Sequence, residues 1–280
     1  MNQSITSIHI RQQLRDLSEP ELWISVAASG QADGLELHGR LVGPRCVYAT
    51  TVEVAYPLRP FPRLPEGLPL LSRRIVIPEA SYWDPQSPFL YEGTVELWQG
   101  NERRDGVSVT VGLKITTLSQ RGVRLNGHIV DVQGCLASPT LEDAGRLRAE
   151  GLNTLIVPVR PDNGDLWEFA DRIGLLLLGQ IEAGPLPIPL LQARMQHACC
   201  LGWIAPAARL DELTAARISG FRGVWLETKP EAALPASAEF VLASEGLLPA
   251  LESIALPKLF LRPGNGHNGQ ARNSIGWVTG

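Results

Sequence analysis

The second half of the chain alternates short apolar runs with segments of helical periodicity, and no other feature constrains the fold as strongly. From about residue 119 onward, runs such as "NTLIVPV", "LLLLGQI" and "ACCLGWI" are separated by segments whose apolar residues recur at helical spacing. Near-continuous apolar strands that alternate with helices indicate a parallel sheet that is covered on both faces. Counting from "HIVDVQGC" to "SIGWVTG" gives eight strands, which is the number in a (β/α)8 barrel.

The predicted barrel is unusually short. Residues 119–280 supply about 160 residues, whereas barrels of this type usually need roughly 200 or more. We therefore expect a compact barrel in which several helices, above all the one after "GVWLE", are very short or missing. An incomplete barrel and an open doubly wound sheet are the alternatives that the pattern leaves open.

The first half of the chain has the pattern of a β domain. Residues 1–118 contain about seven short segments, several with period-two alternation, separated by turns rich in Gly, Pro, Asn and Asp. That count in about 110 residues is typical of an immunoglobulin-like β-sandwich. The proline-rich stretch "PLRPFPRLPEGLPLL" predicts a loop or an edge, because proline cannot donate to a strand ladder. The expected fold is thus a multidomain β plus α/β chain, with a sandwich in 1–118 and a TIM-type barrel in 119–280.

Charge and composition exclude several classes of function. The net charge is -4 and no basic run occurs, which argues against a nucleic-acid partner. The longest apolar runs are far shorter than the ~20 residues that cross a bilayer, and no apolar leader is visible, so we expect a cytoplasmic protein without a membrane partner. The four cysteines lack zinc-binding spacing, and no phosphate-binding loop occurs; we expect reduced structural cysteines, no metal and no cofactor.

Four segments, in order along the chain, resemble glycoside hydrolase family 2. "SYWDPQSPFLYEGTVEL" is similar to the family's segment before the barrel, "RGVRLNGHIVDVQGC" to its first barrel strand, "AEGLNTLIVPVRPDNGDLWEFADRIGLLLLGQI" to its second and third units, and "RMQHACCLGWI" to its fourth strand. The matching residues are Trp83, Asp84, Pro85, Pro88, Leu90, Tyr91, Gly122, Asn126, Gly127, Val130, Gly134, Gly151, Leu152, Asn153, Pro161, Asp171, Gly174, Arg194, His197 and Trp203. The resemblance covers Trp83 to Trp203, lacks the family's N-terminal jelly-roll domain and fades after residue 208.

The resemblance implies a glycosidase frame without its acid/base group. Most members of the family are retaining enzymes, which flank the scissile bond with two carboxylates. Their acid/base is the Glu of an Asn-Glu pair closing the fourth strand, and that pair corresponds to Ala207 and Ala208 here. Alanine cannot give or accept a proton. Other polar positions of the family site are also replaced, by Ile156 and Val159 on the second strand and by Gly179-Gln180 on the third.

Other side chains near the predicted strand ends are candidates for a site. Glu182, Glu227 and Glu245 follow the third, fifth and sixth barrel strands, and the last two could replace the lost catalytic pair. The alternative interpretation is a solvated loop charge for Glu227 and a helix N-terminal carboxylate for Glu245. The indole rings of the barrel tryptophans could stack on a sugar, although core packing is their commoner role. These substrate-binding candidates are Trp203, Trp225, Trp277 and Glu182.

Three functions follow as hypotheses. The first is a catalytically degenerate family 2-like pseudoenzyme with a carbohydrate-binding or scaffold role. The second is an active O-glycosyl hydrolase that uses Glu227 and Glu245 as relocated carboxylates. The third is a structural module that binds a protein partner through the sandwich edge. They predict, respectively, a pocket lined by Trp and neutral groups, two carboxylates in an open pocket, and an exposed apolar patch.

Overall fold

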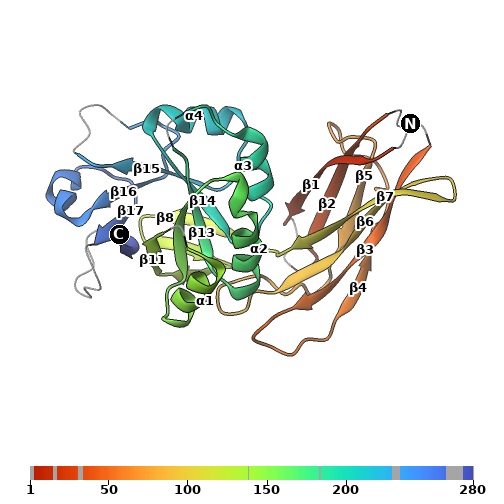
Figure 1. Ribbon diagram of the computed structural model, residues 1–280, viewed down its shortest axis with the longest axis horizontal. Helices are drawn as coiled ribbons and strands as arrows, with labels where there is room; N and C mark the ends of the chain where they lie inside the picture. The colour runs from red at the N-terminus through yellow and green to blue at the C-terminus, as the bar shows by residue number, and fades with distance from the viewer. Residues whose placement is uncertain are drawn as a thin grey trace. The chain divides into compact units, whose positions relative to one another are not determined.

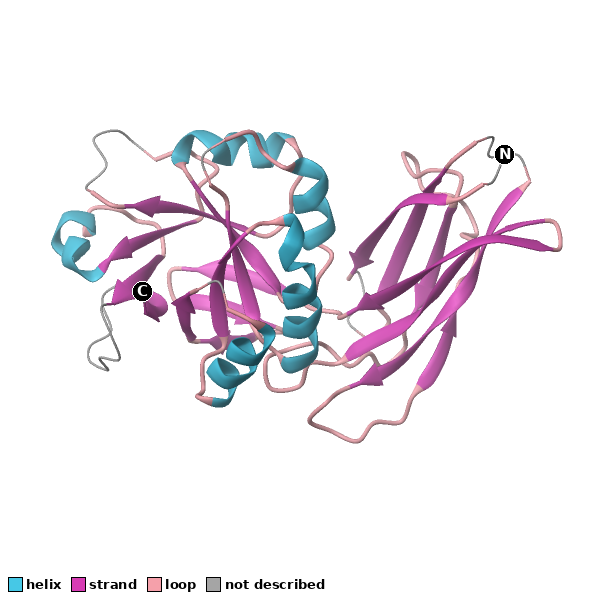
Figure 2. Ribbon diagram, in the orientation of Figure 1, coloured by secondary structure: helices cyan, strands magenta, loops and turns pink. Residues whose placement is uncertain are grey.

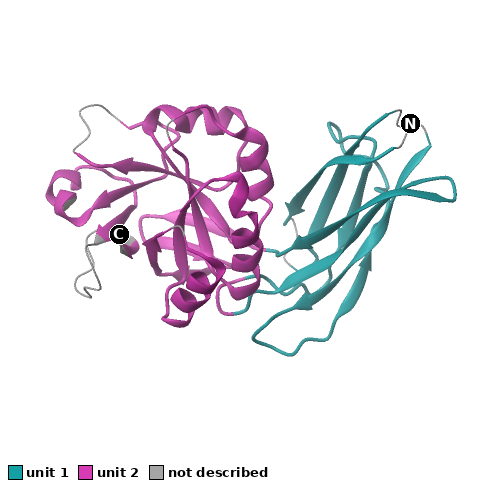
Figure 3. Cartoon of the chain, in the orientation of Figure 1, with its two compact units in different colours: residues 1–83, 87–113 teal, residues 84–86, 114–280 magenta. Residues whose placement is uncertain are grey.

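The structure is a computed structural model that describes residues 3–14, 18–30, 34–137, 139–182, 184–228, 234–262 and 274–279. The chain forms two compact units, coloured separately in Figure 3. Unit 1 consists of residues 1–83 and 87–113, and unit 2 consists of residues 84–86 and 114–280. The short segment 84–86 therefore interrupts unit 1, and the expected boundary near residue 118 lies inside a strand of unit 2.

Unit 1 consists of two antiparallel sheets, with strand orders β1-β2-β5 and β4-β3-β6-β7. The strands are β1 (Ile5–Gln13), β2 (Glu21–Ala28), β3 (Leu35–Arg45), β4 (Val54–Pro57), β5 (Ser72–Val76), β6 (Leu90–Gln99) and β7 (Glu102–Val111). Both sheets contribute to one apolar core. On β2, for example, Leu22, Ile24 and Val26 are buried while the residues between them are not, as expected for a strand with one face on a core.

The hydroxyl of Tyr91 ties the start of β6 to the chain that leads into it. This side chain is fully buried, accepts a hydrogen bond from the Ser81 backbone N–H at 2.9 Å, and donates to the Ser81 carbonyl oxygen at 3.3 Å. Burial raises the pKa of Tyr91 to about 12, so the hydroxyl keeps its proton at neutral pH. Its ring meets Tyr56 edge-on, with the ring centroids 5.8 Å apart. The position of this bond resembles the tyrosine corner of antiparallel sandwiches.

Unit 2 begins with a small antiparallel sheet of three strands. These strands are β8 (Thr116–Ser119), β9 (Gly122–Leu125) and β10 (His128–Val130). The turn between β9 and β10 is Asn126-Gly127, and both residues have positive φ, which is the conformation that an Asn-Gly hairpin turn requires. The prediction that "HIVDVQGC" forms one strand is wrong, because this segment divides at Asp131 into β10 and the first strand of the next sheet.

The remaining strands of unit 2 close into a parallel barrel (Figures 1 and 2). They are β11 (Val132–Leu136), β12 (Thr154–Pro158), β13 (Leu176–Gln180), β14 (Cys200–Ala205), β15 (Phe221–Leu226), β16 (Phe240–Ser244), β17 (Lys258–Arg262) and β18 (Ser274–Thr279). The ring is complete, since β18 pairs with β11 in parallel, Gly276 opposite Val132. The alternatives of an incomplete barrel and an open doubly wound sheet are therefore wrong.

Helices follow only part of the barrel in the described chain. The α-helices are α1 (Leu141–Ala149), α2 (Gly164–Ile173), α3 (Ile188–Arg194) and α4 (Ala207–Ala215), and the 3-10 helices are η1 (Pro161–Asn163) and η2 (Glu245–Leu251). Each of the four α-helices lies between two barrel strands, as the alternating pattern predicted. After α4, the described residues contain η2 but no further α-helix.

Glycines allow the backbones of the barrel to approach closely. A Cβ atom at Gly276 would lie 2.0 Å from the Val132 carbonyl oxygen, and one at Gly134 would lie 2.2 Å from the Thr154 carbonyl oxygen. Gly174 ends α2 with φ +72°, and a Cβ there would lie 2.3 Å from the Pro85 carbonyl oxygen. Side chains at these positions would push paired or packed backbones apart.

Among the described helices, none is long and apolar enough to cross a membrane.

The Tyr91 hydrogen bonds should contribute measurably to the stability of unit 1. Replacing Tyr91 by Phe removes the hydroxyl and leaves the Ser81 N–H without its acceptor, which costs about 1–3 kcal/mol of unfolding free energy. Urea unfolding followed by fluorescence should therefore show a lower midpoint for Tyr91→Phe. Tyr56→Phe keeps the ring contact and should change the unfolding free energy by less than about 0.5 kcal/mol. Equal midpoints for the two variants would contradict this role.

Candidate functional site

The carboxyl ends of the barrel strands form the face where the resemblance places a catalytic site. Strand β14 ends at Ala205, and only Pro206 separates it from α4, which begins at Ala207. Ala207 and Ala208 therefore form the first turn of α4, with Ala208 exposed to solvent. The next carboxylate along the chain is Asp211, which lies on α4 and accepts a hydrogen bond from the Ser237 hydroxyl at 2.6 Å. No proton donor occupies the position that corresponds to the family's acid/base group.

The other replaced positions are packed rather than solvated. Ile156 is fully buried on β12, and Val159 is half-buried just beyond its end. Gly179 on β13 faces both Val159 and the ring of Trp203, because a Cβ atom there would lie 2.8 Å and 2.7 Å from them. Gln180, the last residue of β13, is half-buried. At these four positions on or next to β12 and β13 the side chains are therefore apolar, absent or neutral.

The three candidate glutamates lie at strand ends, in two separate places. Glu182 pairs with Arg160 at 3.3 Å across the ends of β12 and β13, and both side chains are largely exposed. Glu227 is exposed directly after β15, and half-buried Glu245 is the first residue of η2 after β16. The register pairs Leu226 of β15 with Ala243 of β16, so Glu227 and Glu245 follow neighbouring strands, as the sequence suggested.

The three candidate tryptophans have different environments. Trp203 is fully buried; its indole N–H donates to the Ser219 carbonyl oxygen at 2.6 Å, and its ring stacks on Trp167 of α2 with centroids 6.0 Å apart. This ring is part of the packing between β14 and α2 and has no exposed face for a sugar. Trp225 and Trp277 are half-buried on β15 and β18 and keep part of their surface accessible.

A buried polar cluster lies where α2 meets the start of β14. Asp171 of α2 accepts hydrogen bonds from the Cys199 backbone N–H and from His197 Nδ1, each at 2.7 Å. The Lys114 ammonium, also buried, donates to the carbonyl oxygens of Ala198 and Cys200. Burial raises the pKa of the Cys199 thiol well above its ordinary value and that of Cys200 to about 11, so neither thiol is a ready nucleophile.

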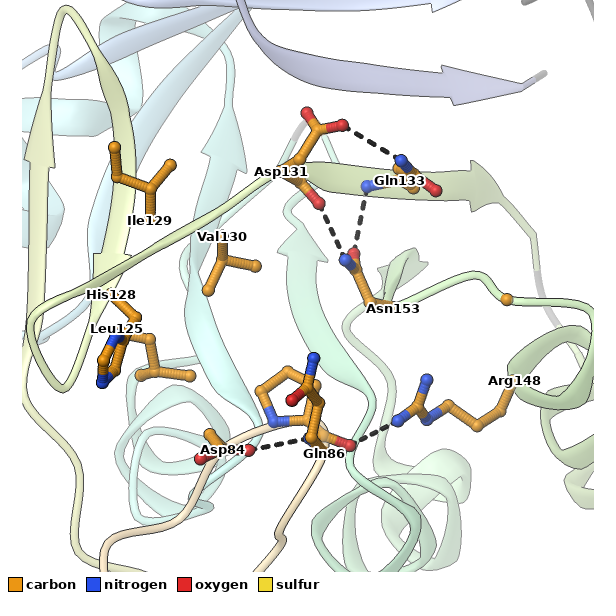
Figure 4. A pocket seen from close by; sticks show the side chains of 12 residues that line it. Asp84, Gln86, Leu125, His128, Ile129, Val130, Asp131, Gln133, Arg148 and Asn153 are labelled. Atoms are coloured by element: carbon orange, nitrogen blue, oxygen red, sulfur yellow. Dashed lines mark hydrogen bonds between the residues drawn. The ribbon is translucent and has the colours of Figure 1, made fainter.

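A pocket of about 380 Å³ opens at the opposite, amino-terminal ends of β11 and β12 (Figure 4). Its wall is formed by the loop 84–86, by the β9–β10 hairpin, and by the C-terminal end of α1. Leu125, Ile129 and Val130 supply apolar surface, and Ile129 is 57% exposed. The volume lies in the range of roughly 300–1,000 Å³ that small-molecule sites occupy.

The polar side of this pocket is a hydrogen-bonded group around Asn153 (Figure 4). The Asn153 amide donates to the Asp131 carbonyl oxygen at 2.7 Å and accepts from the Gln133 backbone N–H at 3.0 Å. The Gln133 side-chain amide donates to the Asp131 carboxylate at 3.0 Å. On the facing side, the Arg148 guanidinium donates to the carbonyl oxygens of Pro85 and Ile173. These bonds fix the directions of the Asp131, Gln133, Asn153 and Arg148 side chains.

The sequence did not indicate this pocket, because its residues come from three separate segments, 84–86, 125–133 and 148–153. In the sequence, Asn153 and the Asn126-Gly127 turn match the family only as structural residues of the barrel. The polar side chains of Asp131, Gln133 and Asn153 are the only sequence feature that points to a binding pocket here. Their spacing along the chain does not predict that they meet.

Comparison with known proteins identifies solved structures that share this fold. No protein-family model matches the sequence, and no curated protein matches it. Among solved structures, a glycosyl hydrolase family 2 member from Bacteroides cellulosilyticus DSM 14838 covers 99% of the chain at 14% identity with a TM-score of 0.74. The β-glucuronidase of Ruminococcus gnavus and β-glucuronidase 2 of Bacteroides uniformis also cover 99%, each at 13% identity, with TM-scores of 0.70 and 0.69. The chain has the glycoside hydrolase family 2 fold.

The match is to part of each solved structure. The chain corresponds to 46%, 62% and 46% of those three proteins, respectively, and so spans about half of their length. The family 2 fold is thus present in its β domain and its barrel. At 13–14% identity, the similarity establishes the fold alone. The chemistry of this chain depends on its own residues.

Proposed function

We propose that this chain is a catalytically degenerate protein of the family 2 type, with a binding or scaffold role in place of glycoside hydrolysis. The observation that carries the proposal is the junction of β14 and α4, where Ala207 and Ala208 form the first helical turn. Glycoside cleavage of this type needs a proton donor beside the leaving oxygen and a second carboxylate about 5 Å away. Methyl side chains supply neither group.

The packing around the junction supports this proposal. The acid/base position belongs to a helix turn joined to the strand by a single residue, Pro206, so the chain there has no loop that could carry a substitute carboxylate. Buried Ile156 and the Gly179–Trp203 contact close the neighbouring strand ends with apolar groups. These contacts support a barrel with a complete core and with uncharged residues at the positions that correspond to the family's catalytic groups.

The ligand we propose for the binding role is a neutral carbohydrate, held in the pocket of Figure 4. Sugars offer hydroxyl groups for carboxylate and amide side chains, and C–H faces for apolar ones. The pocket presents both kinds of surface: Asp131 and Gln133 on one side, and Leu125, Ile129 and Val130 on the other.

Unit 1 fits the role of the β domain that would accompany such a barrel. Its two antiparallel sheets and the hydrogen bond of the Tyr91 hydroxyl support an immunoglobulin-like sandwich.

An active hydrolase with relocated carboxylates is the competing proposal. Glu227 and Glu245 follow neighbouring strands at the carboxyl end of the barrel, so their side chains are within reach of one region. This arrangement differs from that of the family, in which the acid/base follows the fourth strand.

A role in binding a protein partner is favoured by one observation on unit 1. Val47, Tyr48, Val52 and Val54 are between 47% and 85% exposed, and they lie on or just before β4, an edge strand. A hollow of about 510 Å³ lies beside them. Exposed apolar side chains next to an unpaired strand edge are the features that a partner strand would use.

The absence of hydrolysis is tested with a panel of aryl glycosides that includes glucosides, galactosides, mannosides and glucuronides. We expect the native chain to release no more phenol than buffer does, because no general acid is present at Ala208. The variants Glu227→Gln and Glu245→Gln should behave identically to the native chain. Glu168→Gln, an exposed carboxylate on α2, is the matched control. Turnover that Glu168→Gln retains and that either strand-end variant loses would establish the relocated hydrolase instead.

Carbohydrate binding is tested by NMR titration with methyl glycosides of the same sugars. We expect shift changes in residues 128–133 and 148–153, and a dissociation constant about fivefold higher in Asp131→Ala, since a hydrogen bond to a carboxylate is worth about 1 kcal/mol or more. Asp162→Ala, an exposed carboxylate of η1, should bind like the native chain. Shift changes confined to Trp225 and Trp277 would move the binding site to the carboxyl end of the barrel, and no changes at all would leave the scaffold role.

A further inference from the structure

Three side chains of metal-ligating types meet in unit 2, where α2 packs on the start of β14. They are a carboxylate from Asp171, an imidazole from His197 and a thiol from Cys199, and their ligand atoms all lie within 4.8 Å of one another. Asp171 and Cys199 are 3% and 0% exposed. We propose that these three residues bind a single zinc ion. The proposal is independent of the function of the barrel.

The separations suit a tetrahedral ion after a small adjustment. With zinc bonds of about 2.0 Å to nitrogen and oxygen and about 2.3 Å to sulfur, tetrahedral ligand atoms lie roughly 3.3–3.5 Å apart. His197 Nδ1 and Asp171 Oδ2 are 2.7 Å apart, so they must separate slightly. The Cys199 sulfur lies within 4.8 Å of the other two ligand atoms and must approach them by about 1.3 Å at most. Side-chain rotations of this size need no movement of α2 or β14.

The neighbouring groups hold the three ligands in place. The Cys199 backbone N–H donates to Asp171 Oδ1 at 2.7 Å and leaves Oδ2 directed at His197. The Cys199 thiol donates to the Trp167 carbonyl oxygen at 3.4 Å, and zinc binding replaces this hydrogen bond because the thiolate has no proton. Hydrogen bonds that orient ligating groups in this way are a regular feature of zinc sites. The His197 side chain is 18% exposed and marks the route by which the ion and a fourth ligand, water, reach the cluster.

The charge balance also favours a thiolate-bound dication. Zinc binding removes the proton from the Cys199 sulfur, and the imidazole proton moves from Nδ1 to Nε2, which faces away from the ion. One thiolate and one carboxylate then neutralise the two charges of the ion. Lys114 and Arg194 are cations near the cluster, and the Lys114 ammonium is directed at the carbonyl oxygens of Ala198 and Cys200. The soft sulfur ligand favours zinc over magnesium or calcium, which prefer oxygen.

Cobalt(II) is a spectroscopic probe for this site, because it takes zinc's tetrahedral geometry and gives a charge-transfer band with thiolates. The full chain is treated with a chelator, dialysed and titrated with cobalt under reducing conditions. We expect one equivalent of cobalt per chain to produce a thiolate band together with the intense visible bands of a tetrahedral ion. Zinc should then abolish both by displacement.

Two neighbouring cysteines provide a matched pair of variants. Cys199→Ser should lose the thiolate band, while Cys200→Ser, whose sulfur is equally buried, should keep it. His197→Gln should weaken cobalt binding by at least the ~10–100-fold that loss of a ligand's own hydrogen-bond partner costs. Melting curves in chelator verify that each variant is folded.

Several outcomes would overturn the proposal. A native chain that gives no thiolate band in excess cobalt would show that the three residues form a hydrogen-bonded cluster only. A band that survives Cys199→Ser would assign the metal to another cysteine, such as the half-buried Cys46. Visible bands of low intensity would indicate an octahedral ion at the surface. A native chain without the band overturns the proposal even if a variant fails to fold, and a band that is lost in folded Cys199→Ser and kept in Cys200→Ser supports it.

Discussion

Hydrogen bonding between β11 and β18 closes the barrel, and the rest of unit 2 depends on that closure. The two strands pair from Val132 opposite Gly276 to Cys135 opposite Thr279. A Cβ atom at position 276 would collide with the Val132 carbonyl, so the strands reach pairing distance only because a glycine stands there. Closure sets the positions of all strand ends, and with them the positions of Glu227, Glu245 and the pocket beneath β11 and β12.

The interactions that close and fill the barrel do not involve the groups that catalysis would need. Trp203 fills the space between β14 and α2 through its contact with Trp167 and its bond to the Ser219 carbonyl. Gly179 leaves room for that ring. These residues are required for folding whether or not Ala208 is replaced by a carboxylate. The fold of unit 2 is therefore compatible with alanine at position 208.

Much of the fold could be predicted from local patterns, and most of the failures concern non-local ones. Apolar periodicity located the four α-helices, and runs such as "ACCLGWI" located the barrel strands. The apolar signal is weak in β1, because every residue of its segment "ITSIHIRQQ" is half-buried or exposed. The count of eight strands predicted a barrel but left an incomplete or open form as alternatives, because closure joins strands at opposite ends of unit 2. The burial of Trp203 and the meeting of Asp131 with Asn153 are likewise properties of packing.

The central claim is that the barrel has no catalytic carboxylate pair, and covalent trapping tests it most directly. Retaining glycosidases form a covalent bond to the sugar through their nucleophilic carboxylate. The β-glucuronidase 2 of Bacteroides uniformis has been solved covalently bound to cyclophellitol-6-carboxylate aziridine. The measurement is the intact mass of this chain after incubation with aziridines of that type in several sugar configurations. The account predicts an unchanged mass, and the addition of one inhibitor per chain at Glu227 or Glu245 would contradict it.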